Sequence, residues 1–176
     1  MKKAFTLIEL LIVIAILGIL AVGLLIALDP IEQTRRATDA TVLRSASDTK
    51  NAIDRYYTGK LYYPWCTAAS PAGGCTLDVA ICATAATAYL LNTGCGTGVL
   101  SALVNTGELK ATLPLPMTGV IYLGIGAGGT SYTLSFNPVS KSYDVNTNTK
   151  YTNSLCTILG GAGVCTVAPN TCYFCL

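Results

Sequence analysis

The sequence predicts an α+β protein in which a long N-terminal helix is followed by a small antiparallel β-sheet packed on the helix's C-terminal half. Three observations lead to this prediction. An unbroken apolar run is followed by a stretch with helical period, the region after residue 118 is rich in Tyr, Val, Ile and Thr, and all eight cysteines lie beyond residue 65. A chain of 176 residues has room for one domain besides the helix.

The apolar run extends from Phe5 to Leu28, and its only ionisable side chain is Glu9. As an α-helix it would be about 36 Å long, enough to cross a hydrocarbon core of about 30 Å. Apolar residues occupy every face of this helix, so it must be buried all round, either in lipid or among similar helices.

Glu9 is the exception in this run. A charged side chain at membrane depth costs about 2.5–3.5 kcal/mol, and less near an interface. Two interpretations are open. The carboxylate extends to the lipid headgroups, or it pairs with a cation on a neighbouring copy, because this chain offers no nearby partner except its own amino end.

The first residues, MKKAFTLIELLIVIAILGILA, closely resemble the class III signal and N-terminal helix of type IV pilins and type II secretion pseudopilins. In that family a prepilin peptidase cuts before the Phe, the new amine is methylated, and the Glu pairs with the amine of an adjacent subunit. The resemblance therefore implies cleavage between Ala4 and Phe5, N-methylation of Phe5, and an assembly role for Glu9. Ala4 departs from the family, which nearly always has Gly there.

The resemblance also implies the partners and the location. The partners would be other copies of the chain in a helical homopolymer, the prepilin peptidase and the inner-membrane assembly machinery. The protein would be inserted in the cytoplasmic membrane before assembly and lie at the cell surface, in an extracellular filament, afterwards.

A kink or a local opening of the helix is expected where Asp29 and Pro30 end the apolar run. Pro30 cannot donate to the carbonyl of Ile26, and its ring crowds that turn. Gly18 and Gly23 loosen the preceding turns. The resemblance implies that this zone can unwind when subunits pack into a filament, and an ordinary kinked membrane helix is the alternative.

Beyond the kink the helix becomes amphipathic. We expect it to run from Phe5 to Tyr57 and to stop at Gly59. One apolar stripe recurs at helical spacing: Val42, Ala46, Thr49, Ile53 and Tyr56. Opposite charges lie four residues apart: Glu32–Arg36, Arg35–Asp39, Arg44–Asp48 and Lys50–Asp54. These charges form either a solvated face or contacts between subunits.

The remaining chain divides into a connection and a sheet. In the connection, the aromatic cluster Tyr62-Tyr63-Pro64-Trp65 is expected to cover the top of the helix, and short helices are expected at Ala80–Leu91 and Val99–Leu109. Strands are predicted at Gly119–Gly124, Thr130–Asn137 and Lys141–Asn146. The last two would form a hairpin through the turn Asn137–Ser140, with Tyr132, Leu134 and Phe136 facing the stalk helix.

The glycine loop Ile125–Gly129 lies between the first two predicted strands. It lacks the strand–GxGxxG–helix context and the Lys of a phosphate loop, so we interpret it as a turn. The expected organisation is a leader at 1–4, a transmembrane or filament-core helix at 5–28, the amphipathic half of the stalk at 29–58, a Cys-containing connection at 59–117, and the sheet with a Cys-rich region at 118–176.

The cysteines form two similar clusters. The segments Trp65–Cys82 and Leu155–Cys172 both read C-T-x7-C-T-x5-C, and one more cysteine follows each. The simplest pairing is sequential: Cys66–Cys75, Cys82–Cys95, Cys156–Cys165 and Cys172–Cys175. A bridge between the clusters and a chance similarity are both open alternatives. An even number of cysteines behind an export signal predicts disulfides and an oxidising compartment.

The composition excludes several functions. The chain has no His, and residues 61–176 hold three basic and three acidic side chains, so we find no catalytic set and expect no enzyme, no cofactor and no Cys/His zinc site. A net charge of +2 gives no case for nucleic-acid binding. Oxygen ligands near the C-terminus are too few in acids to predict a metal site: Asp144, Asn146, Asn148 and Asn153.

Three functions are consistent with these observations. The leading hypothesis is a structural subunit of a type IV pilus, which polymerises through its hydrophobic helix. The alternative is a type II secretion pseudopilin or a minor pilin. A third is an adhesin that binds through the Cys-rich loops or the aromatic cluster, including Trp65. Electron conduction along the helix is disfavoured, because no aromatic residue lies between Phe5 and Tyr56.

Overall fold

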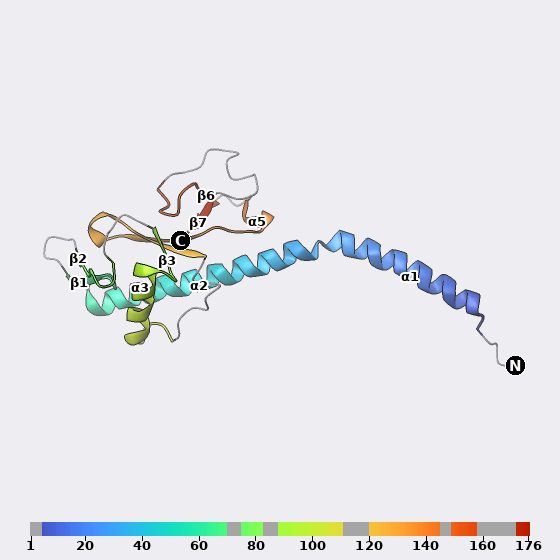
Figure 1. Ribbon diagram of the computed structural model, residues 1–176, viewed down its shortest axis with the longest axis horizontal. Coiled ribbons are helices and arrows are strands. Elements are labelled where there is room, and N and C mark those ends of the chain that lie inside the picture. The colour runs from blue at the N-terminus through green and yellow to red at the C-terminus, as the bar shows by residue number, and fades with distance from the viewer. Residues whose placement is uncertain (1–4, 70–74, 83–87, 111–119, 145–148, 158–171) are drawn as a thin grey trace. The chain divides into compact units, whose positions relative to one another are not determined.

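A computed structural model describes residues 5–69, 75–82, 88–110, 120–144, 149–157 and 172–176 (Figure 1). The fold is α+β, with helical structure from Leu7 to Lys60 followed by a small antiparallel sheet. The chain divides into two compact units, Met1–Arg35 and Arg36–Leu176. Each unit is described by itself below.

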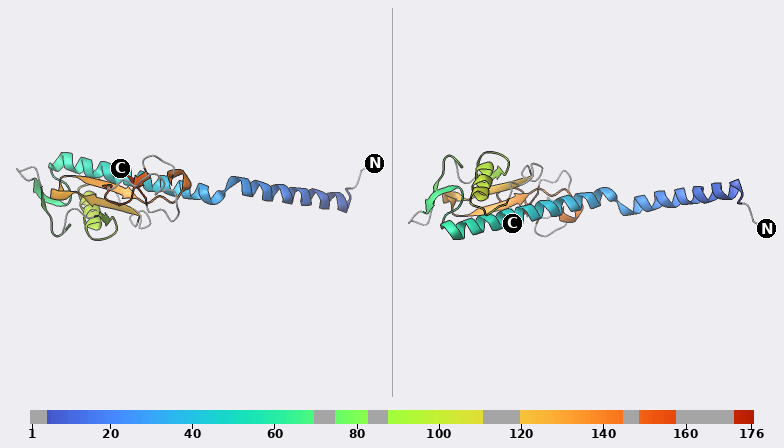
Figure 2. Two further views of the ribbon diagram at one scale, coloured as in Figure 1. Left: turned by 90° about the horizontal axis from the view of Figure 1, so that it is seen from above. Right: turned by 90° about the horizontal axis from the view of Figure 1, so that it is seen from below.

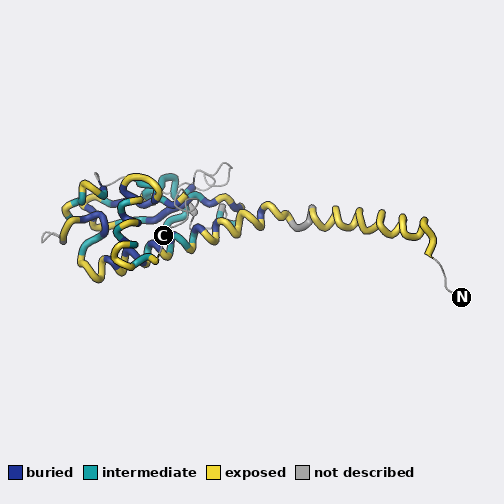
Figure 3. The backbone as a smooth tube through the Cα atoms, turned by 60° about the horizontal axis from the view of Figure 1, so that its bottom comes forward, coloured by how far each residue is buried: buried dark blue, intermediate teal, exposed yellow. Residues whose placement is uncertain are grey.

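The first unit contains helix α1 (Leu7–Leu28) and the start of helix α2 (Pro30–Lys60). Every α1 residue from Leu7 to Leu25 is exposed, as the yellow trace in Figure 3 shows. An apolar helix without any buried face within its own unit is the arrangement that the sequence predicted.

The two helices are separated by a break at Asp29. Asp29 adopts a left-handed conformation (φ 36°, ψ 70°), and its carboxylate accepts a hydrogen bond of 3.4 Å from the amide of Glu32. Asp before Pro suits the cap and first position of a new helix, because Pro30 has no amide hydrogen to leave unpaired. The structure therefore places the interruption of the helix at Asp29 and Pro30, where the sequence predicted a kink or local opening.

Helix α2 ends later than expected. The stop at Gly59 was wrong, because the helix continues through Lys60. Leu61 then takes the left-handed position (φ 64°), and its amide donates to the carbonyl of Tyr57 at 2.7 Å. This bond closes the last turn in the way that a glycine usually does.

The second unit contains a five-stranded antiparallel sheet of order β3-β4-β5-β7-β6 and a two-stranded hairpin, β1-β2. The sheet strands are β3 (Ala88–Leu90), β4 (Ile121–Ile125), β5 (Tyr132–Phe136), β6 (Thr149–Tyr151) and β7 (Tyr173–Cys175). The hairpin strands are β1 (Cys66–Ala69) and β2 (Cys75–Leu77). The last strand of the chain thus lies between β5 and β6.

Among the described residues, three short helical elements accompany these strands: α3 (Gly94–Asn105), the 3-10 turn η1 (Ala127–Gly129) and α5 (Lys141–Asp144). The turn η1 joins β4 to β5, as the glycine-loop interpretation predicted. The helix expected at Val99–Leu109 is α3, shifted towards the N-terminus.

The core lies between α2 and the sheet. The predicted apolar stripe is confirmed, since each of its members is at most 8% exposed: Val42, Ala46, Thr49, Ile53 and Tyr56. Leu134 and Phe136 of β5 are buried in the same unit, and the hydroxyl of Tyr132 reaches the carbonyl of Lys50 on α2 at 3.3 Å. Both views in Figure 2 show the sheet strands beside this helix.

Two other expectations were wrong. The segment Ala80–Leu91 is not a helix where it is described, because residues 80 and 81 lie in a turn and Ala88–Leu90 form β3. The predicted strand Lys141–Asn146 begins instead with helix α5, so no hairpin forms across Asn137–Ser140. The physical reason is a distant acceptor, the carboxylate of Asp39, which binds the amides of Val139 and Ser140.

Candidate functional site

The first turn of α1 holds Glu9 in a capping box with Thr6. The Thr6 amide and hydroxyl donate to one oxygen of the Glu9 carboxylate at 2.9 and 2.7 Å, and the Glu9 amide approaches the Thr6 hydroxyl at 3.4 Å. This reciprocal arrangement satisfies amide groups that the start of a helix leaves without partners. The sequence T-L-I-E supplies the required spacing of three residues.

The capping box leaves part of the carboxylate available. Both Thr6 bonds reach Oε2, and among the described residues Oε1 of Glu9 has no partner. A carboxylate has about four lone-pair positions, so it can accept further donors. Glu9 is also at the positive end of the helix dipole, which favours its charged form.

The structure describes Phe5 but not Ala4, the two residues on either side of the expected cleavage point. Ala4 lies outside the described residues, so cleavage between Ala4 and Phe5 stays a prediction. Phe5 is 73% exposed and precedes the capping box. An amine created at Phe5 would be one residue from the Thr6 amide that holds Glu9.

Gly18 and Gly23 both lie inside an intact part of α1. A methyl group added at either position would meet no atom within 4 Å, so neither glycine is required by close packing within the chain. The structure places the helix break at Asp29 instead. Unwinding around Gly18, Gly23 and Pro30 on assembly stays a prediction.

The family comparison falls on the same segment. Residues 1–25 match the family model described as the prokaryotic N-terminal methylation motif. This segment is the class III signal of type IV pilins and pseudopilins. The class III signal therefore includes the Thr6–Glu9 capping box and most of α1. No curated protein and no solved structure matches the chain.

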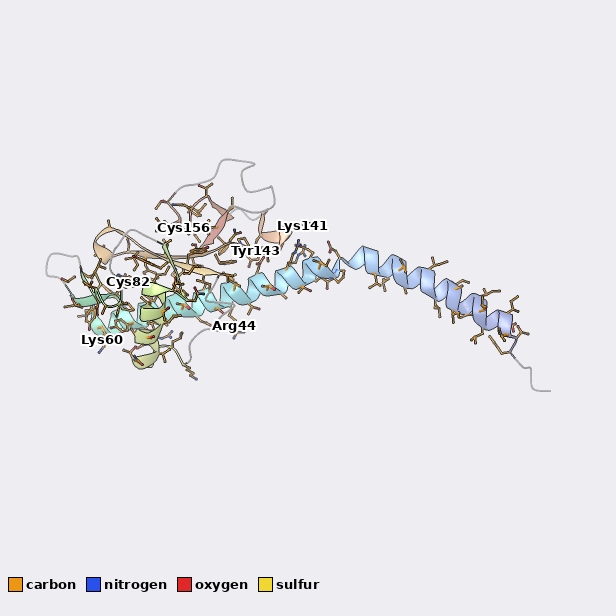
Figure 4. The ribbon with its side chains drawn as sticks, in the orientation of Figure 1. Arg44, Lys60, Cys82, Lys141, Tyr143 and Cys156 are labelled. Atoms are coloured by element: carbon orange, nitrogen blue, oxygen red, sulfur yellow. A yellow bond between two sulfur atoms is a disulfide. The ribbon has the colours of Figure 1, made fainter. Side chains whose placement is uncertain are left out.

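The apolar helix behind the class III signal meets the requirements of a membrane span. By length and composition, the helical stretch Leu7–Lys60 includes a window that is apolar enough to cross a bilayer, and none of that window is buried in the structure. Figure 4 shows the side chains of α1 projecting outward around the helix. A signal for membrane insertion and a helix suited to it thus occur together.

The disulfides lie in the second unit. Cys66 bonds Cys75 and Cys82 bonds Cys95, the two sequential pairs expected in the first cluster. In the second cluster, however, Cys156 bonds Cys175, so the pairs Cys156–Cys165 and Cys172–Cys175 were wrong. Cys172 is also disulfide-bonded, and Cys165 lies outside the described residues. Figure 4 shows Cys82 and Cys156 in separate parts of this unit.

The Cys156–Cys175 pairing results from the sheet order. Strand β7 lies beside β5, with Cys175 opposite Ser135. The loop that carries Cys156 is held to the same strand, because the Ser135 hydroxyl donates to the carbonyl of Ser154 at 2.7 Å. Pairing of strands distant in sequence brings these cysteines together, and no local spacing could have revealed it.

Trp65 is the buried ring of the aromatic cluster, whereas Tyr62 and Tyr63 are partly exposed. Trp65 is 0% exposed, and its indole N–H donates to the carbonyl of Gly129 at 2.9 Å. Its ring stacks on Tyr63, with the ring centres 4.7 Å apart. The Trp65 side chain therefore cannot be the contact surface of an adhesin.

Tyr132 is linked to the same cluster and to α2. Its hydroxyl donates a short hydrogen bond to the Asp54 carboxylate. Burial first, and then the neighbouring Asp54 carboxylate, raise the pKa of Tyr132 far above the value usual for tyrosine. The predicted Lys50–Asp54 pairing missed this tyrosine as the partner of Asp54.

Candidate metal ligands give no site in the described part of the chain, where no group of three or more His, Cys, Asp or Glu side chains could hold an ion. Asn146 and Asn148, two members of the C-terminal oxygen set, lie outside the described residues.

Proposed function

We propose that this chain is a structural subunit of an extracellular type IV pilus and polymerises through its hydrophobic N-terminal helix. The observation that carries the proposal is the class III signal at residues 1–25, joined to a helix exposed on every side from Leu7 to Leu25. Such a helix needs an apolar environment, which lipid supplies before assembly and neighbouring helices supply within a filament.

Glu9 gives this assembly its register. A carboxylate in an apolar helix bundle is costly unless it is paired, and Oε1 of Glu9, which has no partner among the described residues, could accept a bond from the N-terminal amine of a second copy. Prepilin peptidase would create that amine by cutting between Ala4 and Phe5, and the amine of Phe5 would then be methylated.

The second unit suits a surface exposed to the medium. Three disulfides are described there, and the regions beyond Leu61 carry little charge. Disulfides form in an oxidising compartment outside the cytoplasm and would stabilise the second unit there.

The proposal is tested by shearing cells and identifying this chain, with its N-terminus, in the released fibres by mass spectrometry. We expect long filaments composed mainly of a chain that begins at methylated Phe5. Filaments composed of a chain that begins at Met1 would show that the leader is not cleaved. A chain confined to the cell envelope would instead support the pseudopilin or minor-pilin alternative.

A further inference from the structure

Four aromatic side chains of the second unit form a connected set, which we call the aromatic chain: Tyr57, Tyr63, Trp65 and Tyr132. Tyr57 stacks on Tyr63 with ring centres 4.6 Å apart, and Tyr63 stacks on Trp65 at 4.7 Å with only 8° between the ring planes. Tyr132 approaches both Tyr63 and Trp65 edge-on, at 5.6 Å in each case. All four rings are thus in mutual contact through Tyr63.

The two ends of the aromatic chain differ in their access to water. Trp65 is completely buried, and it is the single tryptophan in the sequence. Tyr57, in the last turns of α2, is 41% exposed. The stack therefore leads from the interior of the unit to its surface.

A proton acceptor is placed beside the aromatic chain. The Tyr132 hydroxyl donates to the carboxylate of Asp54, and its second acceptor is the carbonyl of Lys50 at 3.3 Å. A phenol that loses an electron also gives up its proton, and a hydrogen-bonded carboxylate can take that proton at once. Burial raises the pKa of Tyr132, so the phenol holds its proton until an electron leaves.

We propose that the aromatic chain is a one-electron relay, which moves an oxidising equivalent from the buried indole of Trp65 to the exposed phenol of Tyr57 with Asp54 as proton acceptor. Oxidative damage would then fall on a surface phenol. The buried indole, whose N–H donates to the Gly129 carbonyl, would be restored.

The steps balance in electrons and protons. Light ejects one electron from the Trp65 indole, and dissolved oxygen takes up that electron to form superoxide. Tyr132 returns an electron to the indole and passes its phenol proton to Asp54. Tyr57 then supplies an electron through the Tyr63 ring and releases its own proton to water, while Asp54 returns the proton to Tyr132. The net loss is one electron and one proton from Tyr57.

The relay is local. No aromatic residue lies between Phe5 and Tyr56 in the sequence, so the aromatic chain has no continuation along α1. The proposal concerns the second unit alone and does not depend on the proposed filament function.

The test is laser flash photolysis of the full-length protein in detergent micelles and air-saturated buffer, with light at the red edge of the indole absorption. Because the chain has one tryptophan, the oxidising equivalent starts at Trp65. We expect the indolyl radical band to decay as a phenoxyl radical band rises at the same rate. A spin trap followed by peptide mass spectrometry should place the adduct on Tyr57.

Phenylalanine variants keep the rings but remove their oxidisable phenols. Tyr63→Phe combined with Tyr132→Phe should abolish the coupled phenoxyl rise, and Tyr57→Phe should move the adduct to Tyr63 or Tyr132. Asp54→Asn should slow the transfer. Tyr62→Phe is the matched control, because the described ring contact of Tyr62 is with Tyr56, outside the aromatic chain.

The results separate clearly. A coupled decay and rise in the wild-type protein and in Tyr62→Phe, lost in the double variant, would support the relay. The relay is overturned if the indolyl radical decays equally fast in the double variant, or decays without a phenoxyl signal. Circular dichroism verifies that each variant is folded, and the mass of the intact protein verifies that its disulfides are formed.

Discussion

The buried carboxylate of Asp39 on α2 accepts a hydrogen bond of 2.8 Å from the backbone amide of Ser140, at the start of α5. The Val139 amide donates to the same carboxylate at 3.0 Å. Asp39 is only 2% exposed and binds the loop after β5 to the helix. The helical pattern suggested Arg35 as its partner, but its partners are amides far away in sequence.

Asp39→Ala should lower the free energy of unfolding by about 1–3 kcal/mol, because two backbone amides, that of Ser140 buried, lose a charged acceptor. Denaturant unfolding of the full-length protein in micelles measures the loss. Asp48→Asn, an exposed change on the same helix, is the control and should have almost no effect. Equal stability of the Asp39 variant and the wild type would show that the Asp39 contacts contribute nothing.

Glu9→Ala should leave membrane insertion intact and impair filament assembly or subunit order, because the helix keeps its apolar length and loses its only charge. Cell fractionation reports insertion, and the yield of sheared filaments reports assembly. Thr6→Ala separates the two roles of this turn, since it removes the cap hydroxyl, worth about 1 kcal/mol, and keeps the carboxylate. Normal filaments at normal abundance in Glu9→Ala would refute the pairing.

Gly124→Val should destabilise the second unit. A Cβ on Gly124 would lie 2.9 Å from the Leu155 side chain and 2.6 Å from the Thr133 hydroxyl, so the loop that carries Leu155 must move. We expect a loss of about 1–3 kcal/mol in thermal or denaturant unfolding. Gly59→Ala is the control, because nothing lies within 4 Å of its added methyl group, and it should be neutral or slightly stabilising.

Replacing Cys156 and Cys175 together with serine should cost about 3 kcal/mol, the value expected for a loop of this size. Hydrogen exchange should rise most in β7, which carries Cys175 at the chain end. Because both cysteines belong to one bond, Cys156→Ser alone should cost nearly as much as the double change. Clearly additive single effects would contradict this pairing.

Alkaline pH should weaken the second unit. The pKa of Tyr132 is raised in the folded state by burial and then by Asp54. Unfolded tyrosine ionises near pH 10, so the stability due to this shift is complete below about pH 10 and decreases as the pH rises further. Tyr132→Phe should flatten this decrease in stability curves collected between neutral and alkaline pH. An unchanged slope would mean that Tyr132 does not control it.

Local patterns revealed much of this protein. The apolar run, the buried stripe on α2 and the alternation in β5 all depend on residues close in sequence, whose periodicity dictates which side is buried. The same locality allowed the pairs Cys66–Cys75 and Cys82–Cys95 to be predicted. The class III signal likewise occupies one continuous segment.

Only the tertiary structure decided the rest. Strand β7 lies between β5 and β6, and this position allows the Cys156–Cys175 bond. The Asp39 carboxylate accepts hydrogen bonds from the amides of Val139 and Ser140, and helix α5 follows where a strand was predicted. The partner of Asp54 is likewise Tyr132 on β5. In each case the local sequence favoured a partner or an element close by, and a hydrogen bond or a strand pairing between distant residues replaced it. Charge pairs four residues apart on a helix contribute only a few tenths of a kcal/mol, less than a buried hydrogen bond. Sequence spacing carries no information about such contacts.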